Sequence, residues 1–498
     1  MDLGKQKLPV GIDCFEKLRH ENCYYVDKTG FIIDLLNNYS EATLITRPRR
    51  FGKSLNMRML EAFFSPESDK SIFDGLKITG EHGLCSEYMG KYPVISLSLK
   101  RINAASFSLA YKLASSVIRQ AAAKVYDLVK DDINLKSFDN EILSQLLQSN
   151  IEESALYESL YSLSSILEKH YGKKVIILID EYDVPLAKAY EHGYYDQMVF
   201  LIRNLFENTL KSNDSLKFAV LTGCMRLSKE SLFTGLNNLE VMSVSDDTYS
   251  EYFGFTDREV QDLLKYYDLH GSYQSIKEWY DGYRFGSTNV YCPWDVISYC
   301  RKLQHNRRHP PENFRINTSD NSVVQKFIDH CTSPNVKSDI EALINGEPVK
   351  KKIRQELTYR DMYSSIDNIW SVLFTTGYLT YKDRLDSRVF NLAIPNLEIR
   401  DVFAEHILEL FKDYVNTNCN RVNCLYEALQ SENAAEAEGI LSSFLRQTIS
   451  LRDASVPNPL KENFYHGLLV GLFIPMGGWS VSSNQEAGNG YCDIMMRS

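Results

Sequence analysis

The sequence predicts an α/β chain that begins with a doubly wound parallel sheet. Short apolar runs alternate with helical stretches over residues 1 to about 245, a pattern typical of parallel strands joined by helices. One run, residues 42–46, leads through a short loop into Gly52-Lys53-Ser54, and another, residues 175–179, ends in Asp180-Glu181. Ligands of such sheets bind beyond the carboxyl ends of the strands, so both segments are candidate parts of one site.

The segment after the first strand has the features of a phosphate-binding loop. It reads Arg-Pro-Arg-Arg-Phe-Gly-Lys-Ser, and a helix is predicted to begin at Leu55. Backbone N–H groups and the positive end of the helix dipole then point at one place, which favours an anion. Lys53 supplies a charge for the outer phosphates of a nucleotide, and the Ser54 hydroxyl can ligate Mg²⁺. The alternative is a surface turn, in which Gly-Lys-Ser also occurs by chance.

One position departs from the usual phosphate-loop pattern. That pattern has a second glycine five residues before Gly52, and this chain has Arg47 there. The residues expected to contact the nucleotide are Arg47, Pro48, Arg49, Arg50, Phe51, Gly52, Lys53, Ser54 and Leu55.

The strand at residues 175–179 is followed by the acids that such a site requires. Five consecutive apolar residues indicate a strand buried on both faces. Asp180 is placed to hold the water shell of Mg²⁺ beside Ser54, and Glu181 to orient or deprotonate the attacking water. The alternative is a buried strand that ends in a solvated acidic turn, which is common in α/β proteins.

A third strand, at residues 216–223, adds two candidate residues. In ATPases that keep a Glu after the Mg-binding Asp, a further strand lies between the strand before the phosphate loop and the strand before the acids. This strand ends in a polar residue that senses the γ-phosphate. Thr222 suits that role. Arg226 is a candidate for stabilising charge on the transferred phosphoryl group from within the same chain, although an arginine in a loop is often only a salt-bridge partner.

Further motifs extend over nearly the whole chain. They are Leu8-Pro9-Val10-Gly11, Tyr25-Val26-Asp27-Lys28-Thr29, Asp180-Glu181-Tyr182-Asp183, Ser228-Lys229-Glu230-Ser231, Gly235-Leu236-Asn237-Asn238 and Trp279-Tyr280-Asp281-Gly282-Tyr283-Arg284-Phe285-Gly286. Together with the loop, they make this sequence similar to the AAA-ATPase-like proteins that carry a C-terminal PD-(D/E)xK nuclease-type domain. The resemblance implies a P-loop NTPase core, and Arg47 in place of glycine is then the usual form of the loop.

Three domains are expected. Residues 1–245 form the AAA-like P-loop ATPase core, 246–390 a mostly helical lid or adaptor region, and 391–498 a partial α/β domain of the restriction-endonuclease type. Within the second, residues 259–265 have helical spacing. The aromatic stretch at residues 279–285 either stacks on a base or, as tyrosine and phenylalanine more often do, packs beneath a turn.

The resemblance also implies a nuclease metal site near the C-terminus. Asp493 is expected at the end of a strand, and Glu462 on the preceding predicted helix would support the metal. The Glu-x-Lys strand that should follow is absent, because the sequence stops at Ser498, and Tyr491 stands where the family usually has arginine. We therefore expect a truncated or inactive nuclease.

Composition limits the setting and the partners. The net charge of the 498 residues is −10, which neither supports nor excludes contact with DNA or RNA through a local basic groove. No apolar run approaches the ~20 residues of a membrane span, and the N-terminus lacks a secretion signal, so cytoplasmic residence is expected. Oligomeric state stays open.

Two functions follow from these observations. The first is Mg-dependent ATP binding and hydrolysis, coupled to a C-terminal nuclease-like module that acts on nucleic acid. The second is a nucleotide-dependent binding or scaffold protein with little or no hydrolysis.

Overall fold

A computed structural model describes most of the chain, which forms two compact units. The described residues are 5–133, 135–211, 213–226, 233, 238–315, 322–329, 334–406, 419–431, 433–448, 480–487 and 490–497. The first unit comprises Met1–Glu312 and Lys352–Gly377, and the second comprises Asn313–Lys351 and Tyr378–Ser498.

The first unit contains a five-stranded sheet whose strands are all parallel. The strands are Ala42–Thr46 (β1), Val94–Ser98 (β2), Val175–Asp180 (β3), Leu216–Gly223 (β4) and Leu239–Met242 (β5). Their order is β2-β3-β4-β1-β5. The parallel sheet is therefore confirmed, and so is the placement of the third predicted strand between the two motif strands.

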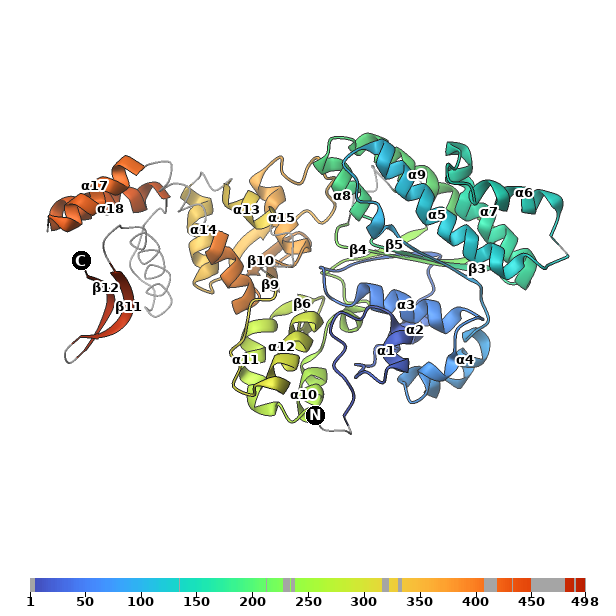
Figure 1. Ribbon diagram of the computed structural model, residues 1–498, viewed down its shortest axis with the longest axis horizontal. Helices are drawn as coiled ribbons and strands as arrows, with labels where there is room; N and C mark the ends of the chain where they lie inside the picture. Colours follow the sequence, from blue (N-terminus) through green and yellow to red (C-terminus); the bar gives the residue numbers. More distant parts are fainter. Residues whose placement is uncertain are drawn as a thin grey trace. The chain divides into compact units, whose positions relative to one another are not determined.

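Helices cover both faces of this sheet (Figure 1). The α-helices of the first unit are Phe15–His20 (α1), Gly30–Asn37 (α2), Lys53–Phe64 (α3), His82–Tyr88 (α4), Phe107–Val129 (α5), Ser137–Leu146 (α6), Glu153–Tyr171 (α7), Val184–Glu191 (α8), Tyr195–Leu210 (α9), Asp257–Tyr266 (α10), Tyr273–Tyr280 (α11), Pro293–His305 (α12) and Ile366–Thr375 (α15). Short 3₁₀ helices lie at Lys70–Phe73, Lys77–Gly80, Leu99–Arg101, Ser250–Tyr252 and His270–Ser272.

The helix after the phosphate loop starts earlier than the sequence predicted. It begins at Lys53 instead of Leu55, with Gly52 as its N-cap residue. Lys53 and Ser54 therefore belong to the first turn of α3, where N–H groups lack helical partners.

The region predicted to be mostly helical also contains short strands. Tyr283–Phe285 (β6) and Thr288–Val290 (β7) form an antiparallel hairpin, and Val349–Lys352 (β8), Val389–Ala393 (β10) and Thr380–Arg384 (β9) form a three-stranded sheet in that order. Strands of three to five residues show too few alternations for sequence periodicity to identify them.

The second unit has helices Ser322–Asp329 (α13), Pro334–Ile344 (α14), Cys419–Gln430 (α17) and Ala434–Thr448 (α18). Near the C-terminus, Ser480–Ala487 (β11) and Gly490–Arg497 (β12) pair as an antiparallel hairpin. The predicted helix at residues 461–469, Glu462 included, and the motif at residues 228–231 lie outside the described residues.

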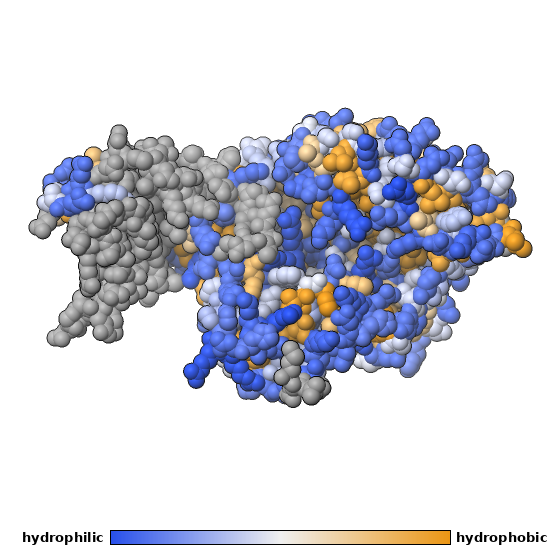
Figure 2. Space-filling view, viewed as in Figure 1, coloured by the Kyte–Doolittle hydropathy of each residue, from blue (hydrophilic) through white to orange (hydrophobic). Residues whose placement is uncertain are grey.

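The surface is largely hydrophilic on the face seen in Figure 2, with small hydrophobic patches. No helix among the described residues is both long enough and apolar enough to span a membrane.

Candidate nucleotide-binding site

The loop between β1 and α3 bends through two residues with left-handed backbone. Arg50 has φ 74° and Gly52 has φ 81°. A Cβ atom on Gly52 would meet nothing within 4 Å, so a larger side chain would have room here. The position favours glycine because its φ angle is positive. The start of the loop is fixed by the Arg47 N–H, which donates to the Gly223 carbonyl oxygen at the end of β4 (3.1 Å).

The Lys53 side chain closes the loop on itself. Its ammonium group donates to the carbonyl oxygens of Arg47 and Pro48, each at 2.9 Å, and lies 3.5 Å from the Cys224 sulfur. Only 4% of the residue is exposed. An ammonium group has three N–H donors, so this one must exchange one of these three contacts to bind a phosphate.

Asp180 is the centre of the site. Its Oδ2 accepts a hydrogen bond from the Ser54 hydroxyl at 2.6 Å, and its Oδ1 accepts one from the Thr222 hydroxyl. Three predicted residues from the ends of β3, β4 and the phosphate loop therefore meet. Carboxylate and hydroxyl oxygens are ligands that suit Mg²⁺, so these residues fit the expected metal.

Glu181 follows Asp180 in an unusual backbone conformation, with φ 54°. A non-glycine residue of this kind costs about 1–3 kcal/mol and is often found at functional sites. Burial raises the pKa of the Glu181 carboxyl, Lys53 and Lys100 oppose the rise, and Asp180 adds to it. A raised pKa is suited to a group that accepts a proton near neutral pH.

Asp183 holds the turn that follows β4, a role that the sequence did not reveal. Its Oδ2 accepts hydrogen bonds from the N–H groups of Cys224 (2.8 Å) and Met225 (2.9 Å). The Tyr182 hydroxyl donates to the Met225 carbonyl oxygen (2.6 Å). Burial raises the pKa of Asp183. The last two residues of the Asp-Glu-Tyr-Asp motif thus position the turn that carries Cys224 against Lys53.

Arg47 anchors the loop from inside the protein. Its guanidinium is fully buried and donates to the carbonyl oxygens of Thr46, Met242, Ser243 and Thr248, at 2.7–3.3 Å. Burial lowers its pKa to about 10. The side chain at the usual glycine position therefore attaches the loop to the segment that follows β5.

Arg50 and Phe51 attach the other end of the loop to residues 283–295. Arg50 forms an ion pair with Asp295 (3.4 Å) and lies over the Trp294 ring (5.4 Å). The ring of Phe51 contacts Tyr283 and Phe285, with centroids 4.9 and 5.1 Å apart. Tyr283 and Phe285 are only 1% and 2% exposed. Of the two interpretations of this aromatic stretch, packing beneath a turn is confirmed for these two rings.

The remaining predicted residues have varied surroundings. Pro48 is buried near Gly377, Arg49 is exposed and Leu55 is half-buried. Arg226 forms an ion pair with Glu356, and their side chains are 22% and 45% exposed. Asp493 lies inside β12 and not after its last residue.

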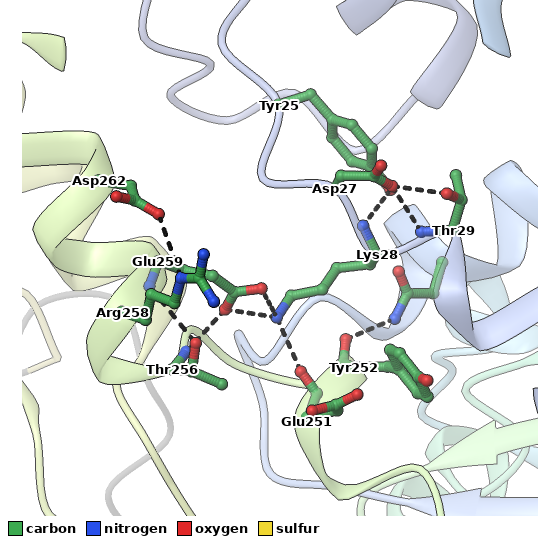
Figure 3. Close-up of polar contacts among 11 residues, drawn as sticks. Tyr25, Asp27, Lys28, Thr29, Glu251, Tyr252, Thr256, Arg258, Glu259 and Asp262 are labelled. Carbon is green, nitrogen blue, oxygen red and sulfur yellow. Dashed lines mark hydrogen bonds and ion pairs between the residues drawn. The ribbon is translucent and has the colours of Figure 1, made fainter. Parts of the chain in front are cut away.

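A second polar cluster joins the motif at residues 25–29 to α10 (Figure 3). The Lys28 ammonium group donates to both carboxylate oxygens of Glu259 (2.6 and 2.7 Å) and to the Glu251 carbonyl oxygen (2.7 Å). The next carbonyl, that of Tyr252, accepts from the side-chain amide of Asn56 on α3 (2.9 Å). The helix that begins with Lys53 is thereby tied to the segment leading into α10.

Two comparisons with known proteins find sequence similarity. A protein of Azotobacter chroococcum mcd 1, named only as an uncharacterized protein in the vnfD 5'region, is 26% identical over 503 residues, which cover 95% of this chain and 84% of the relative. Residues 9–233 match the AAA-ATPase-like family model, which is described as a predicted AAA-ATPase. This range contains the phosphate loop and β3, the strand that ends in Asp180.

Proposed function

We propose that the first unit binds ATP with Mg²⁺ and hydrolyses the terminal phosphate bond, with residues 1–245 as its core. The observation that carries this proposal is that Ser54 and Thr222 both donate hydrogen bonds to Asp180. The match of residues 9–233 to a predicted AAA-ATPase family supports it.

Each residue has a proposed role. The loop N–H groups and Lys53 bind the phosphates, and Ser54 and Asp180 hold Mg²⁺, which would neutralise phosphate charge. Glu181 orients the attacking water and accepts its proton, and Thr222 responds to the γ-phosphate. Arg226 stabilises the developing charge after it leaves Glu356.

Nucleotide binding and phosphate release by the full chain with Mg²⁺ test this proposal. Glu181→Gln should retain ATP binding and lose turnover by about 10²–10⁴-fold, the usual contribution of a general base. Lys53→Ala should lose both. Glu240→Gln is the matched control, because Glu240 is an exposed carboxylate on β5 of the same sheet. Absence of ATP binding by the unaltered chain would contradict the proposal.

One observation favours the second candidate, a nucleotide-dependent scaffold. The Lys53 ammonium group is already bonded to two carbonyl groups of its own loop. If ATP binds while the unaltered chain and Glu181→Gln release phosphate equally slowly, the scaffold function is the correct one.

For the C-terminal part, we propose that residues 391–498 are a nuclease-like module directed at nucleic acid, without cleavage activity of its own. The resemblance of the sequence supports the nuclease-like assignment, and the position of Asp493 inside β12, away from its end, supports the absence of cleavage. Assays with Mg²⁺ or Mn²⁺ on single- and double-stranded DNA and RNA should show no cleavage. Robust cleavage that is abolished by Asp493→Ala would contradict the proposal that the module is inactive. If neither DNA nor RNA binds, the proposal that the module is directed at nucleic acid is wrong.

A further inference from the structure

Among the described residues, one edge strand of the central sheet has no strand paired on its outer side. β2 is the end strand of the sheet and pairs with β3. The Pro93 carbonyl oxygen accepts from the Ile176 N–H of β3 (3.0 Å). Because backbone groups of successive residues point to opposite sides, those of Val94 and Ser96 face away from β3. Unpaired groups of this kind are the groups to which an added strand binds.

A cavity of about 620 Å³ lies along this edge, between α3 and α5. Its apolar lining includes Ala62 of α3, Val94 of β2, and Ala121, Val125 and Leu128 of α5. Leu128 is 37% exposed. A groove with a free strand on one side and apolar walls suits an extended peptide whose alternate side chains are apolar.

The charge of this groove is negative. Arg58 and Lys124 both pair with Glu61, at 2.6 and 3.7 Å. Asp13, Glu16 and Asp127 also line the cavity, and none of the three has an ion pair within the part of the chain that the structure describes. Carboxylates without an ion pair favour a cationic occupant and disfavour a second copy of the same acidic edge.

We propose that this groove binds an extended basic segment of a partner polypeptide, which adds to β2 as a further strand. The cavity lies along residues 93–96, whereas the phosphate site lies beyond Ser98, which pairs with Asp180 at the other end of β2. Binding in the groove is therefore separate from ATP binding and does not rest on the proposed ATPase activity.

The probe is a short fluorescent peptide of alternating lysine and valine, titrated into the full chain without nucleotide and followed by fluorescence anisotropy. A peptide of alternating glutamate and valine is its control. The lysine peptide should bind saturably, and the glutamate peptide should not. The double variant Asp13→Lys/Asp127→Lys should weaken binding about tenfold at low salt, since reversed rim charges mainly affect electrostatic attraction.

Two further variants separate strand addition from general attraction to an acidic protein. Ser96→Pro removes an outward N–H group at an edge position, where proline is tolerated, and should abolish binding while circular dichroism stays unchanged. Glu240→Lys makes the same kind of charge change on the opposite edge strand and should leave binding unaltered. Equal binding of both peptides, or equal losses in the Asp13/Asp127 and Glu240 variants, would overturn the proposal. A dimer of the chain that Ser96→Pro dissociates would also overturn it, because a second copy would then occupy the groove.

Discussion

The ammonium group of Lys28 lies 2.6 Å from the carboxylate of Glu259, and the two side chains are 8% and 25% exposed. This ion pair connects the segment before α2 to the first turn of α10, where Glu259 also accepts a hydrogen bond from the Thr256 N–H (2.7 Å). The two segments are far apart in the sequence, and the pair keeps them together close to the start of α3.

Loss of this ion pair should destabilise the first unit. Lys28→Met leaves the partly buried Glu259 carboxylate without its cation, and breaking a buried pair typically costs about 3–5 kcal/mol. Arg258→Met is the control, because Arg258 and Asp262 form a pair whose side chains are 93% and 65% exposed. It should change the free energy of unfolding by less than ~1 kcal/mol. Urea denaturation measures the free energy of unfolding of both variants. Equal decreases would show that the Lys28–Glu259 pair stabilises the protein no more than an exposed pair does.

The acidic limb of ATP turnover should report on Glu181. Burial raises the pKa of this carboxyl, and its protonated form cannot accept a proton, so turnover should fall as the pH drops through a value above ~4.3, the usual pKa of glutamate. Lys100 lowers that pKa. Lys100→Met should therefore move the limb to higher pH, which a profile of kcat against pH measures. A limb that moves to lower pH, or stays in place, would contradict the assignment of the limb to Glu181.

Arg47 should stabilise the loop even though it stands at a glycine position. Arg47→Met removes the donor from buried carbonyl groups, and each unsatisfied buried group costs about 1–3 kcal/mol. The variant also no longer has to bury a charged guanidinium, and this gain offsets part of the cost. We therefore expect the free energy of unfolding to fall by about 2–4 kcal/mol. Arg101→Met at an exposed position should be within ~0.5 kcal/mol of the unaltered chain. If calorimetry shows no difference between the two variants, Arg47 is not an anchor.

Phe51 provides a test of the contact between the loop and the hairpin β6–β7. Phe51→Ala should cost about 3–5 kcal/mol, because it removes a fully buried ring. Phe200 is 56% exposed, and Phe200→Ala should cost less than ~1 kcal/mol. Phe51→Ala should also weaken ATP binding, measured by titration calorimetry, because the loop loses the surface that supports it.

Local patterns were enough to predict the three strands of the central sheet that carry the site, β1, β3 and β4. The apolar run before Asp180 and the strand that ends with Thr222 and Gly223 were both found, because fully buried strands read as continuous apolar residues. The predicted position of β4, between β3 and β1, was also correct. The edge strand β5 and the short strands β6 to β10 were missed, since three to five residues carry little periodic signal.

The meeting of Ser54 and Thr222 at Asp180 agrees with their expected proximity. The contacts of Arg47, Asp183 and Lys28 could not be predicted. Their partners are backbone groups or residues distant in the chain, such as Glu259 for Lys28, and backbone carbonyl groups have no sequence signature. Arg47 was assigned to the nucleotide from its position alone, and only the fold reveals how its guanidinium is bonded.

The strand order has a consequence for how the protein is made on the ribosome. β1 ends at Thr46, but its two hydrogen-bonded neighbours, β4 and β5, begin at Leu216 and Leu239. At about 5–20 residues per second, the ribosome takes on the order of ten seconds or more to deliver them. During that time β1, which leads into the phosphate loop, has neither of the strands that pair with it in the folded sheet. An apolar strand is exposed meanwhile, so the nascent chain offers a binding site for a chaperone well before it offers one for a nucleotide.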